Sequence, residues 1–211
     1  MITLIIGPMY AGKSSDLFTV TRRHVRQDHK CLFVKYRKDN RYSEDKIYTH
    51  DNINLDEDCL ISPKTIKIED ILKYSPEVVC IDEGQFFDNL VDVSIELSKR
   101  DISVYISALN SDYRGKMFPS IVEIIPHCDT IKFLNAICSR CKEDRGIYSR
   151  RKSDEKEIEL IGGLEMYYVL CRKCLLSELS PEVSYWEIRK KKMKRNMEEI
   201  RKIRKIRKRP L

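Results

Sequence analysis

Residues 2–14 read Ile2-Thr-Leu-Ile-Ile-Gly7-Pro-Met-Tyr-Ala-Gly-Lys13-Ser14, and this stretch decides the fold. The apolar, β-branched run Ile2–Ile6 suits a strand buried on both faces. The pattern GxxxxGK[ST] follows, and a polar stretch with helical character runs from Lys13 to Gln27. A strand before the glycine motif and a helix after it are the context that a nucleotide-binding phosphate loop requires. The alternative is a glycine-rich turn that matches by chance.

The phosphate loop assigns a role to each of its parts. Its glycines let successive backbone N–H groups face phosphate oxygens, and the helix that follows adds its positive N-terminus. Lys13 is expected to reach the β- and γ-phosphates of a nucleoside triphosphate, and Ser14 to offer its hydroxyl to Mg²⁺. The loop residues predicted to bind ATP and Mg²⁺ are Gly7, Pro8, Met9, Tyr10, Ala11, Gly12, Lys13 and Ser14.

Further apolar runs along the chain predict a parallel α/β core. Cys31–Tyr36, Glu77–Asp82 and Ile102–Leu109 are strand-like, and their apolar character is too continuous for a half-exposed sheet. Between the last two runs, residues 89–99 place Leu90, Val93 and Leu97 at helical spacing. Strands that alternate with helices indicate an α/β domain, which we expect over residues 1–137. The polar segment from Arg37 to Asn54 is predicted to be a long surface loop.

Two carboxylates follow the run Val78-Val-Cys-Ile81. Asp82, at the strand end, is positioned to hold Mg²⁺ directly or through water. Glu83 points elsewhere and is the candidate base for a hydroxyl acceptor near the γ-phosphate. An ATPase would use the same glutamate to orient water, so the pair does not by itself separate a kinase from a hydrolase. Two solvated acids at a strand end are the bland alternative.

Four of the eight cysteines form two CxxC pairs, Cys138/Cys141 and Cys171/Cys174, with 29 residues between the pairs. Two such turns can close a tetrahedral S₄ site, and four protein ligands leave no open position, so we expect structural zinc. Redox motifs or chance are the alternatives. The region 138–178 is therefore predicted to be a small metal-held β subdomain. Cys31 and Cys80 stand within apolar runs and are expected to pack in the core.

The positive charge of the chain is concentrated in its C-terminal tail. From Arg189 to Leu211 there are 13 Lys and Arg against two Glu, which leaves 27 basic and 31 acidic residues in the rest of the chain. The mildly acidic body gives no reason to expect a general nucleic-acid-binding surface. The tail, 187–211, is either a basic amphipathic helix, with Met193, Met197 and Ile200 on one face, or a solvated extension, and its partner is unknown.

The start of the chain and its apolar runs bear on where the protein is found. We expect the N-terminus to be a first strand rather than a signal peptide. The sequence contains no apolar run of about 20 residues that could span a bilayer. Eight cysteines without a secretory context favour metal binding or buried thiols over disulfides. The protein is therefore expected in the cytoplasm.

Five motifs, in chain order, resemble the type II thymidine kinases, and both CxxC pairs fit that family as well. The resemblance extends from Leu4 to about Cys174, over four-fifths of the chain. The motifs are Gly-Pro-Met-Tyr-Ala-Gly-Lys-Ser, Lys35-Tyr-Arg-Lys-Asp-Asn-Arg-Tyr42, Thr49-His-Asp51, Ile81-Asp-Glu-Gly-Gln-Phe-Phe87 and Ile161-Gly-Gly163.

The resemblance implies a RecA-like α/β domain with a zinc subdomain that carries a lasso-shaped loop over the nucleoside. It also implies ATP-dependent phosphorylation of thymidine to dTMP for DNA synthesis, a homotetramer, and feedback inhibition by dTTP. Glu83 resembles the family's catalytic base, and Lys13, Ser14 and Asp82 its phosphate and Mg²⁺ groups, to which Gln85 and Arg41 are added. Residues matching those that enclose thymine or sugar are Met9, Phe86, Leu109, Tyr113 and Tyr167, with Ile158, Leu160 and Gly162 in the lasso.

The sequence departs from the family pattern in two places. Asn110 and Tyr113 stand where many members have Asp and Phe, which puts substrate breadth in question more than reaction type. The segment after Cys141 is one residue longer than in relatives, so Ser149 is only provisionally the lasso hydroxyl. Two other functional classes are weighed beside the kinase. One is a P-loop ATPase that acts on nucleic acid or protein, and the other is a zinc-ribbon nucleic-acid binder supported by the basic tail alone.

Overall fold

The computed structural model of this chain describes residues 1–37, 47–48, 54–55, 58–153, 155–159 and 162–179. Within these residues no helix combines the length and the apolar character needed to cross a membrane. The basic tail and its predicted amphipathic helix lie outside the described residues, as do Arg41 and Leu160.

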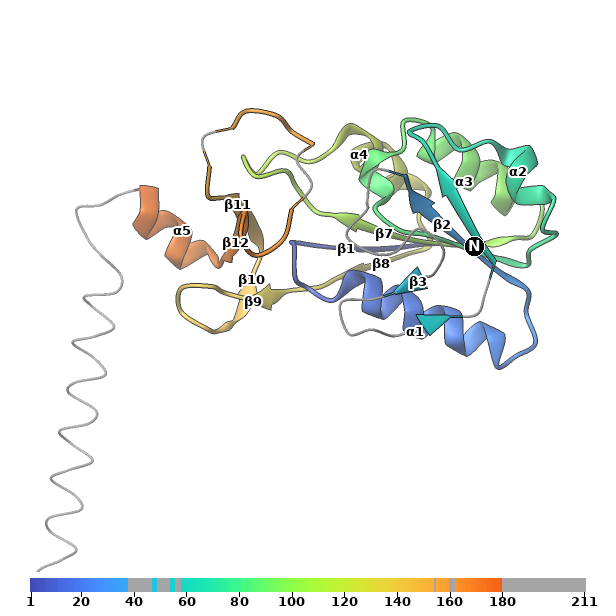
Figure 1. The fold of residues 1–211 in the computed structure, drawn as a ribbon, viewed down its shortest axis with the longest axis horizontal. Helices are drawn as coiled ribbons and strands as arrows, with labels where there is room; N and C mark the ends of the chain where they lie inside the picture. Colours follow the sequence, from blue (N-terminus) through green and yellow to red (C-terminus); the bar gives the residue numbers. More distant parts are fainter. Residues whose placement is uncertain (38–46, 49–53, 56–57, 154, 160–161, 180–211) are drawn as a thin grey trace, which may run out of the picture.

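A six-stranded parallel sheet forms the centre of the fold (Figure 1), with strand order β5-β2-β6-β7-β1-β8. This sheet confirms the predicted parallel α/β architecture. The strands span Ile2–Gly7 (β1), Cys31–Tyr36 (β2), Asp58–Ser62 (β5), Val78–Ile81 (β6), Ser103–Leu109 (β7) and Thr130–Phe133 (β8). Neither edge strand, β5 nor β8, was predicted, because each carries charged or exposed residues instead of a continuous apolar run.

Alternate residues of the central strands pack into two separate cores, one on each face of the sheet. On β1, Leu4 and Ile6 join one core and Ile5 joins the other. Cys31 and Cys80 are buried in the second core, as predicted. A sheet with both faces covered needs apolar side chains at successive positions, which is why these strands are nearly continuous apolar runs.

Helices cover both faces of the sheet (Figure 1). Helix α1 (Lys13–Val25) lies on one face, and α2 (Ile68–Leu72), α3 (Leu90–Ser98) and α4 (Pro119–Ile124) lie on the other. Two 3₁₀ turns, η1 (Gly84–Phe86) and η2 (Ile125–His127), follow β6 and α4. The predicted polar loop departs from expectation at one point, because β3 (Ile47–Tyr48) pairs with β4 (Asn54–Leu55).

A second group of short elements follows the sheet. Strand β9 (Ala136–Ile137) pairs with β10 (Asp144–Gly146), and β11 (Tyr148–Arg151) pairs with β12 (Tyr167–Leu170) before helix α5 (Arg172–Leu179). The four cysteines of the CxxC pairs are buried together between these elements. Residues 152–166 connect β11 to β12, and the structure describes 152–153, 155–159 and 162–166 of them.

Candidate functional site

The phosphate loop occupies the turn from β1 to α1. Its left-handed residues are Tyr10, with φ of 61°, and Gly12, with φ of 78°. A Cβ atom on Gly7 would lie 2.5 Å from the backbone oxygen of Leu134, so only glycine fits at the end of β1. No side chain among the described residues caps the first turn of α1. The loop thus presents backbone N–H groups at a helix N-terminus, the arrangement that binds phosphate.

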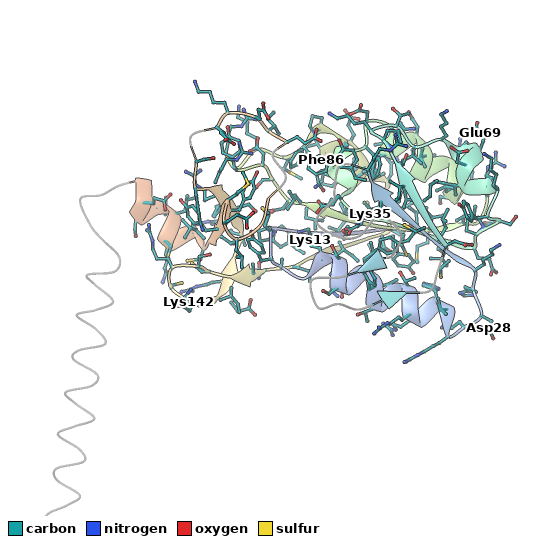
Figure 2. The ribbon with its side chains drawn as sticks, viewed as in Figure 1. Lys13, Asp28, Lys35, Glu69, Phe86 and Lys142 are labelled. Carbon is teal, nitrogen blue, oxygen red and sulfur yellow. The ribbon has the colours of Figure 1, made fainter. Side chains whose placement is uncertain are left out.

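Lys13 lies across this loop. Its side chain is buried, and Nζ donates a hydrogen bond to the Pro8 carbonyl oxygen at 2.9 Å. Figure 2 shows Lys13 and Phe86 at the edge of the core that faces β11 and β12. A buried ammonium held over the loop by one of the loop's own carbonyls is close to the place where phosphates would bind.

Asp82 connects the phosphate loop to the acidic strand end. Its Oδ1 accepts hydrogen bonds from Ser14 Oγ at 3.2 Å, from the Glu83 backbone N–H at 3.0 Å, and from Ser107 Oγ. A hydroxyl and a carboxylate side by side supply the hard oxygen ligands that Mg²⁺ prefers. The residues present therefore fit the predicted Mg²⁺ site.

Ser107 was missed by sequence reasoning. It follows Ile106, which pairs with Ile81 in the β6–β7 register, so it lies beside Asp82. The sequence signal for Ser107 was a polar residue inside a buried strand. Its contact with Asp82 could not be predicted, because the sequence does not show that β6 and β7 are neighbours.

Glu83 has an unusual backbone. Its φ and ψ are 53° and 42°, the left-handed region that costs a residue other than glycine about 1–3 kcal/mol. Glycine follows it, and a Cβ on Gly84 would lie 2.6 Å from Ile106 Cγ2. The strained backbone of Glu83 thus lies directly after Asp82, at the carboxyl end of β6.

Gln85 holds the Glu83 carboxylate in place. The buried Gln85 side chain donates from Nε2 to Glu83 Oε2 at 2.5 Å and accepts at Oε1 from the Leu109 backbone N–H at 2.9 Å. Gln85 was grouped with the ATP and Mg²⁺ ligands, but its side chain contacts Glu83 and Leu109 here. These contacts favour a role in orienting Glu83 and the end of β7.

The predicted nucleoside residues come from both parts of the molecule. Phe86 stacks on Tyr36 with ring centroids 5.1 Å apart and meets Phe118 edge-on at 6.0 Å. The Met9 backbone N–H donates to Ser149 Oγ at 2.9 Å, which places β11 against the phosphate loop. Ser149 thus lies beside the phosphate loop.

Tyr113 and Tyr167 meet at a residue that the sequence did not single out, Arg151. The buried Arg151 guanidinium lies 4.1 Å from the Tyr113 ring centroid and 5.3 Å from that of Tyr167. It also donates to the Tyr167 hydroxyl at 2.8 Å.

The same guanidinium binds the first half of the connection 152–166. It donates to the backbone oxygens of Glu155 at 2.9 Å, Glu157 at 2.5 Å and Ile158 at 3.4 Å. Of the predicted lasso residues, Ile158 is half exposed and Gly162 lies against Met166. Arg151 therefore gathers the described start of the lasso around the two tyrosines.

The four predicted zinc ligands form one buried cluster. Their Sγ atoms all lie within 4.8 Å of one another, and those of Cys141 and Cys171 are 3.7 Å apart. Four sulfurs held about 2.3 Å from a central zinc would be about 3.8 Å apart, so the donor set fits the metal. Burial disfavours charge on Cys138, but backbone hydrogen bonds from Cys141, Cys171 and Arg140 outweigh it and lower the Cys138 pKa.

Comparison with known proteins finds one family over most of the chain. A sequence model described as "Thymidine kinase" matches residues 1–175. The thymidine kinase of Rabbit fibroma virus (strain Kasza) is 41% identical over 173 residues, covering 82% of this chain and 94% of that protein. That of Sheeppox virus (strain KS-1) is 40% identical over 179 residues, covering 84% and 97%. That of Vaccinia virus (strain Western Reserve) is 38% identical over 176 residues, covering 83% and 96%.

Proposed function

This chain belongs to the thymidine kinase family, and on that basis we propose that it transfers the γ-phosphate of ATP to the 5′-hydroxyl of thymidine through Glu83. The observation that carries the proposal is the contact between the phosphate loop and the acidic residues that follow β6. Ser14 Oγ lies 3.2 Å from Asp82 Oδ1, while the adjacent Glu83 carboxylate accepts a hydrogen bond from Gln85. Asp82 is thus placed to hold the metal ion beside the phosphates, and Glu83 is placed to accept a proton.

The triphosphate binds along residues 7–14 in this proposal. Backbone N–H groups of the loop donate hydrogen bonds to its oxygens, and Lys13 exchanges its contact with the Pro8 carbonyl for the β- and γ-phosphates. Ser14 and Asp82 would hold Mg²⁺, which when bound neutralises the negative charge of the phosphates. Arg41, outside the described residues, is proposed near the same phosphates from the family resemblance.

Glu83 accepts the proton of the thymidine 5′-hydroxyl as that oxygen bonds to the γ-phosphorus. The bond between the γ-phosphorus and the oxygen bridging to the β-phosphate breaks, and the products are dTMP and ADP. Gln85 orients the carboxylate by its hydrogen bond to Oε2. Positioning and charge stabilisation supply most of the rate in phosphoryl transfer, so the fixed backbone of Glu83 supports this role.

The nucleoside binds between the end of the sheet and the lasso. We propose Met9, Phe86 and Leu109 as the walls from the core, and Tyr113 and Tyr167 as those beside the lasso. Backbone groups around Ile158, Leu160 and Gly162 would hydrogen-bond the base edge. A base with the wrong donors and acceptors, such as cytosine, would leave buried groups unpaired, which is the basis of selectivity.

We propose that zinc bound by Cys138, Cys141, Cys171 and Cys174 is structural. The cluster fixes the ends of β9–β10 and β12, and with them the connection that carries the lasso. On this basis, residues 138–178 form a subdomain beside the 1–137 core.

Assembly, regulation and location are proposed from the same family. A homotetramer is supported by edge strand β8, where Ile131 and Phe133 are about half exposed, 46% and 51%. Feedback inhibition by dTTP rests on the resemblance alone, and a cytoplasmic location rests on the resemblance and on the cysteine usage of the chain. Light scattering of the purified chain would report the assembly, and a monomer at micromolar concentration would contradict the tetramer.

The test of the function is transfer of labelled γ-phosphate from ATP to thymidine by the purified chain. Parallel reactions contain deoxyuridine, deoxycytidine or no acceptor. The proposal predicts thymidine-dependent formation of dTMP and weak transfer to deoxycytidine. ATP hydrolysis that is the same with every nucleoside would contradict it and favour a P-loop ATPase.

A further inference from the structure

Tyr36 packs against Phe86, which forms part of one wall of the proposed nucleoside pocket. Its ring, at the end of β2, is 1% exposed and stacks on Phe86, with the ring planes at 30° and the centroids 5.1 Å apart. Phe87 meets the same ring edge-on at 5.7 Å. Tyr36 is therefore the support on which Phe86, the proposed base-stacking ring, rests.

The hydroxyl of Tyr36 reaches the lasso. It donates a hydrogen bond to Glu159 Oε1 at 2.6 Å, across 123 residues of sequence. Glu159 stands between Ile158 and Leu160, the residues proposed to present the backbone to the base. Hydrogen bonds to an ionised acceptor are short and are about twice as strong as neutral ones.

A second contact of Glu159 is weaker. Lys64 Nζ lies 3.1 Å from Glu159 Oε2, but the Lys64 side chain is 51% exposed, and exposed ion pairs contribute little. The Tyr36 hydroxyl, by contrast, belongs to a buried ring. Burial, and then the neighbouring Glu159, raise the pKa of Tyr36, so the hydroxyl stays protonated and remains a donor at any working pH.

We propose that Tyr36 and Glu159 are positioning residues for thymidine binding, acting as a latch between the lasso and the base-stacking wall. Tyr36 holds Phe86 with its ring and holds the lasso with its hydroxyl, so this one side chain links the two walls. This inference rests on the proposed thymidine kinase function. A tyrosine that only filled the core would need its ring but not its hydroxyl.

The latch acts on thymidine binding and not on the chemical step. The contacts it orients are made to the base, which is the same in the bound substrate and in the transition state. Weakening them raises KM for thymidine and leaves kcat unchanged, the pattern of uniform binding loss. The ATP contacts, on residues 7–14 and Asp82, do not involve the latch.

The experiment measures KM and kcat for thymidine and KM for ATP in the full chain, in four latch variants and in one control variant, together with melting temperatures. Tyr36→Phe keeps the stacked ring and removes the hydroxyl, Glu159→Ala removes the acceptor, and Glu159→Gln keeps an acceptor oxygen. The fourth variant combines Tyr36→Phe with Glu159→Ala. The matched control is Tyr168→Phe, which removes another tyrosine–carboxylate hydrogen bond, 2.9 Å long, to Glu178 near the cysteine cluster.

We expect Tyr36→Phe and Glu159→Ala each to raise KM for thymidine about ten- to a hundredfold, as the loss of one hydrogen bond to a charged group implies. The values of kcat and KM for ATP stay within about twofold. Glu159→Gln recovers most of the loss, the double variant is no worse than either single variant, and Tyr168→Phe behaves as the wild type.

Two results would overturn the inference, and they are distinguishable from each other. If the wild type forms dTMP but Tyr36→Phe and Glu159→Ala have its KM, or if their effects add in the double variant, there is no latch. If the wild type itself transfers no phosphate to thymidine, the proposed function fails and the latch fails with it.

Discussion

At the scale of single residues, each carboxylate after β6 has a side chain bound to it, Gln85 on Glu83 and Ser107 on Asp82. A carboxylate pair after an apolar run is visible in the chain, and family motifs point to the same position. The contact of Gln85 with Glu83 spans only two residues, but those of Gln85 with Leu109 and of Ser107 with Asp82 depend on which strands are neighbours. The contacts of Arg151 depend on how the lasso folds back over the rings of Tyr113 and Tyr167. Such long-range contacts carry no local sequence signal, so they had to be found in the structure.

Arg151 should stabilise the lasso measurably. Arg151→Met keeps an apolar side chain against Tyr113 and Tyr167 but removes the donors to three loop carbonyls. We expect the free energy of unfolding to fall by about 2 kcal/mol, because hydrogen bonds from a charged donor are lost. Amide hydrogen exchange of residues 155–158 should accelerate.

The matched control for Arg151 is its neighbour on β11, because Arg150 binds the Tyr113 carbonyl instead of the lasso. Arg150→Met should leave exchange at residues 155–158 near the wild-type rate. Equal protection of this stretch in both variants would contradict the role given to Arg151.

Asp112 predicts a pH dependence of stability. Burial opposes its charge, but the backbone N–H groups of Lys116 and Arg114 and the Arg114 guanidinium outweigh burial and lower its pKa. A depressed folded-state pKa stabilises the fold above the unfolded value of about 3.9, and this contribution is lost as the pH falls. Denaturant unfolding between about pH 5 and pH 3 should therefore be less steeply pH-dependent in Asp112→Asn than in the wild type. Parallel curves for the two proteins would show that Asp112 does not contribute.

At the scale of elements, continuous apolar runs predicted the central strands and helix α3 well. A strand whose two faces are both buried has apolar residues at successive positions, as in β1, β2, β6 and β7. The edge strands β5 and β8 were missed because one side of each is open to solvent. The CxxC spacing predicted the cysteine cluster, but it could not predict that β11 would reach the phosphate loop through Ser149 and Met9.

The cysteine cluster predicts one zinc per chain, and it predicts that thymidine binding depends on this zinc more than ATP binding does. Cys171→Ser removes one of four ligands, so zinc content measured by atomic emission should fall from about one per chain towards zero. We expect KM for thymidine to rise steeply, because the lasso is anchored there, while ATP binding persists. Cys128→Ser, at a half-buried cysteine outside the cluster, is the control. Full zinc content in Cys171→Ser would rule out the four-cysteine site.

At the scale of the whole molecule, the proposed catalytic function resides in the body of the chain. The family match ends at residue 175, and the proposed site residues all lie between Gly7 and Cys174. The positive charge lies beyond them, in the tail from Arg189 to Leu211. This separation explains why net charge was a poor guide to function and why the motifs were a good one.

A chain that ends at Leu179 tests this separation. It retains α5 and the cysteine cluster, so we expect kcat and KM for both substrates to stay within about twofold of the full chain. Steady-state kinetics of the two proteins, at matched zinc content, would measure these values of kcat and KM. A loss of more than tenfold would mean that the tail takes part in catalysis or in folding of the body.

The most direct test of the account is phosphate transfer by Glu83→Gln. Glutamine has nearly the shape of glutamate but cannot accept the proton, so thymidine phosphorylation should fall by about a hundredfold or more. The binding of ATP, measured by calorimetry, should stay within about threefold of the wild type. Transfer at near the wild-type rate in Glu83→Gln would contradict the central claim that Glu83 is the base.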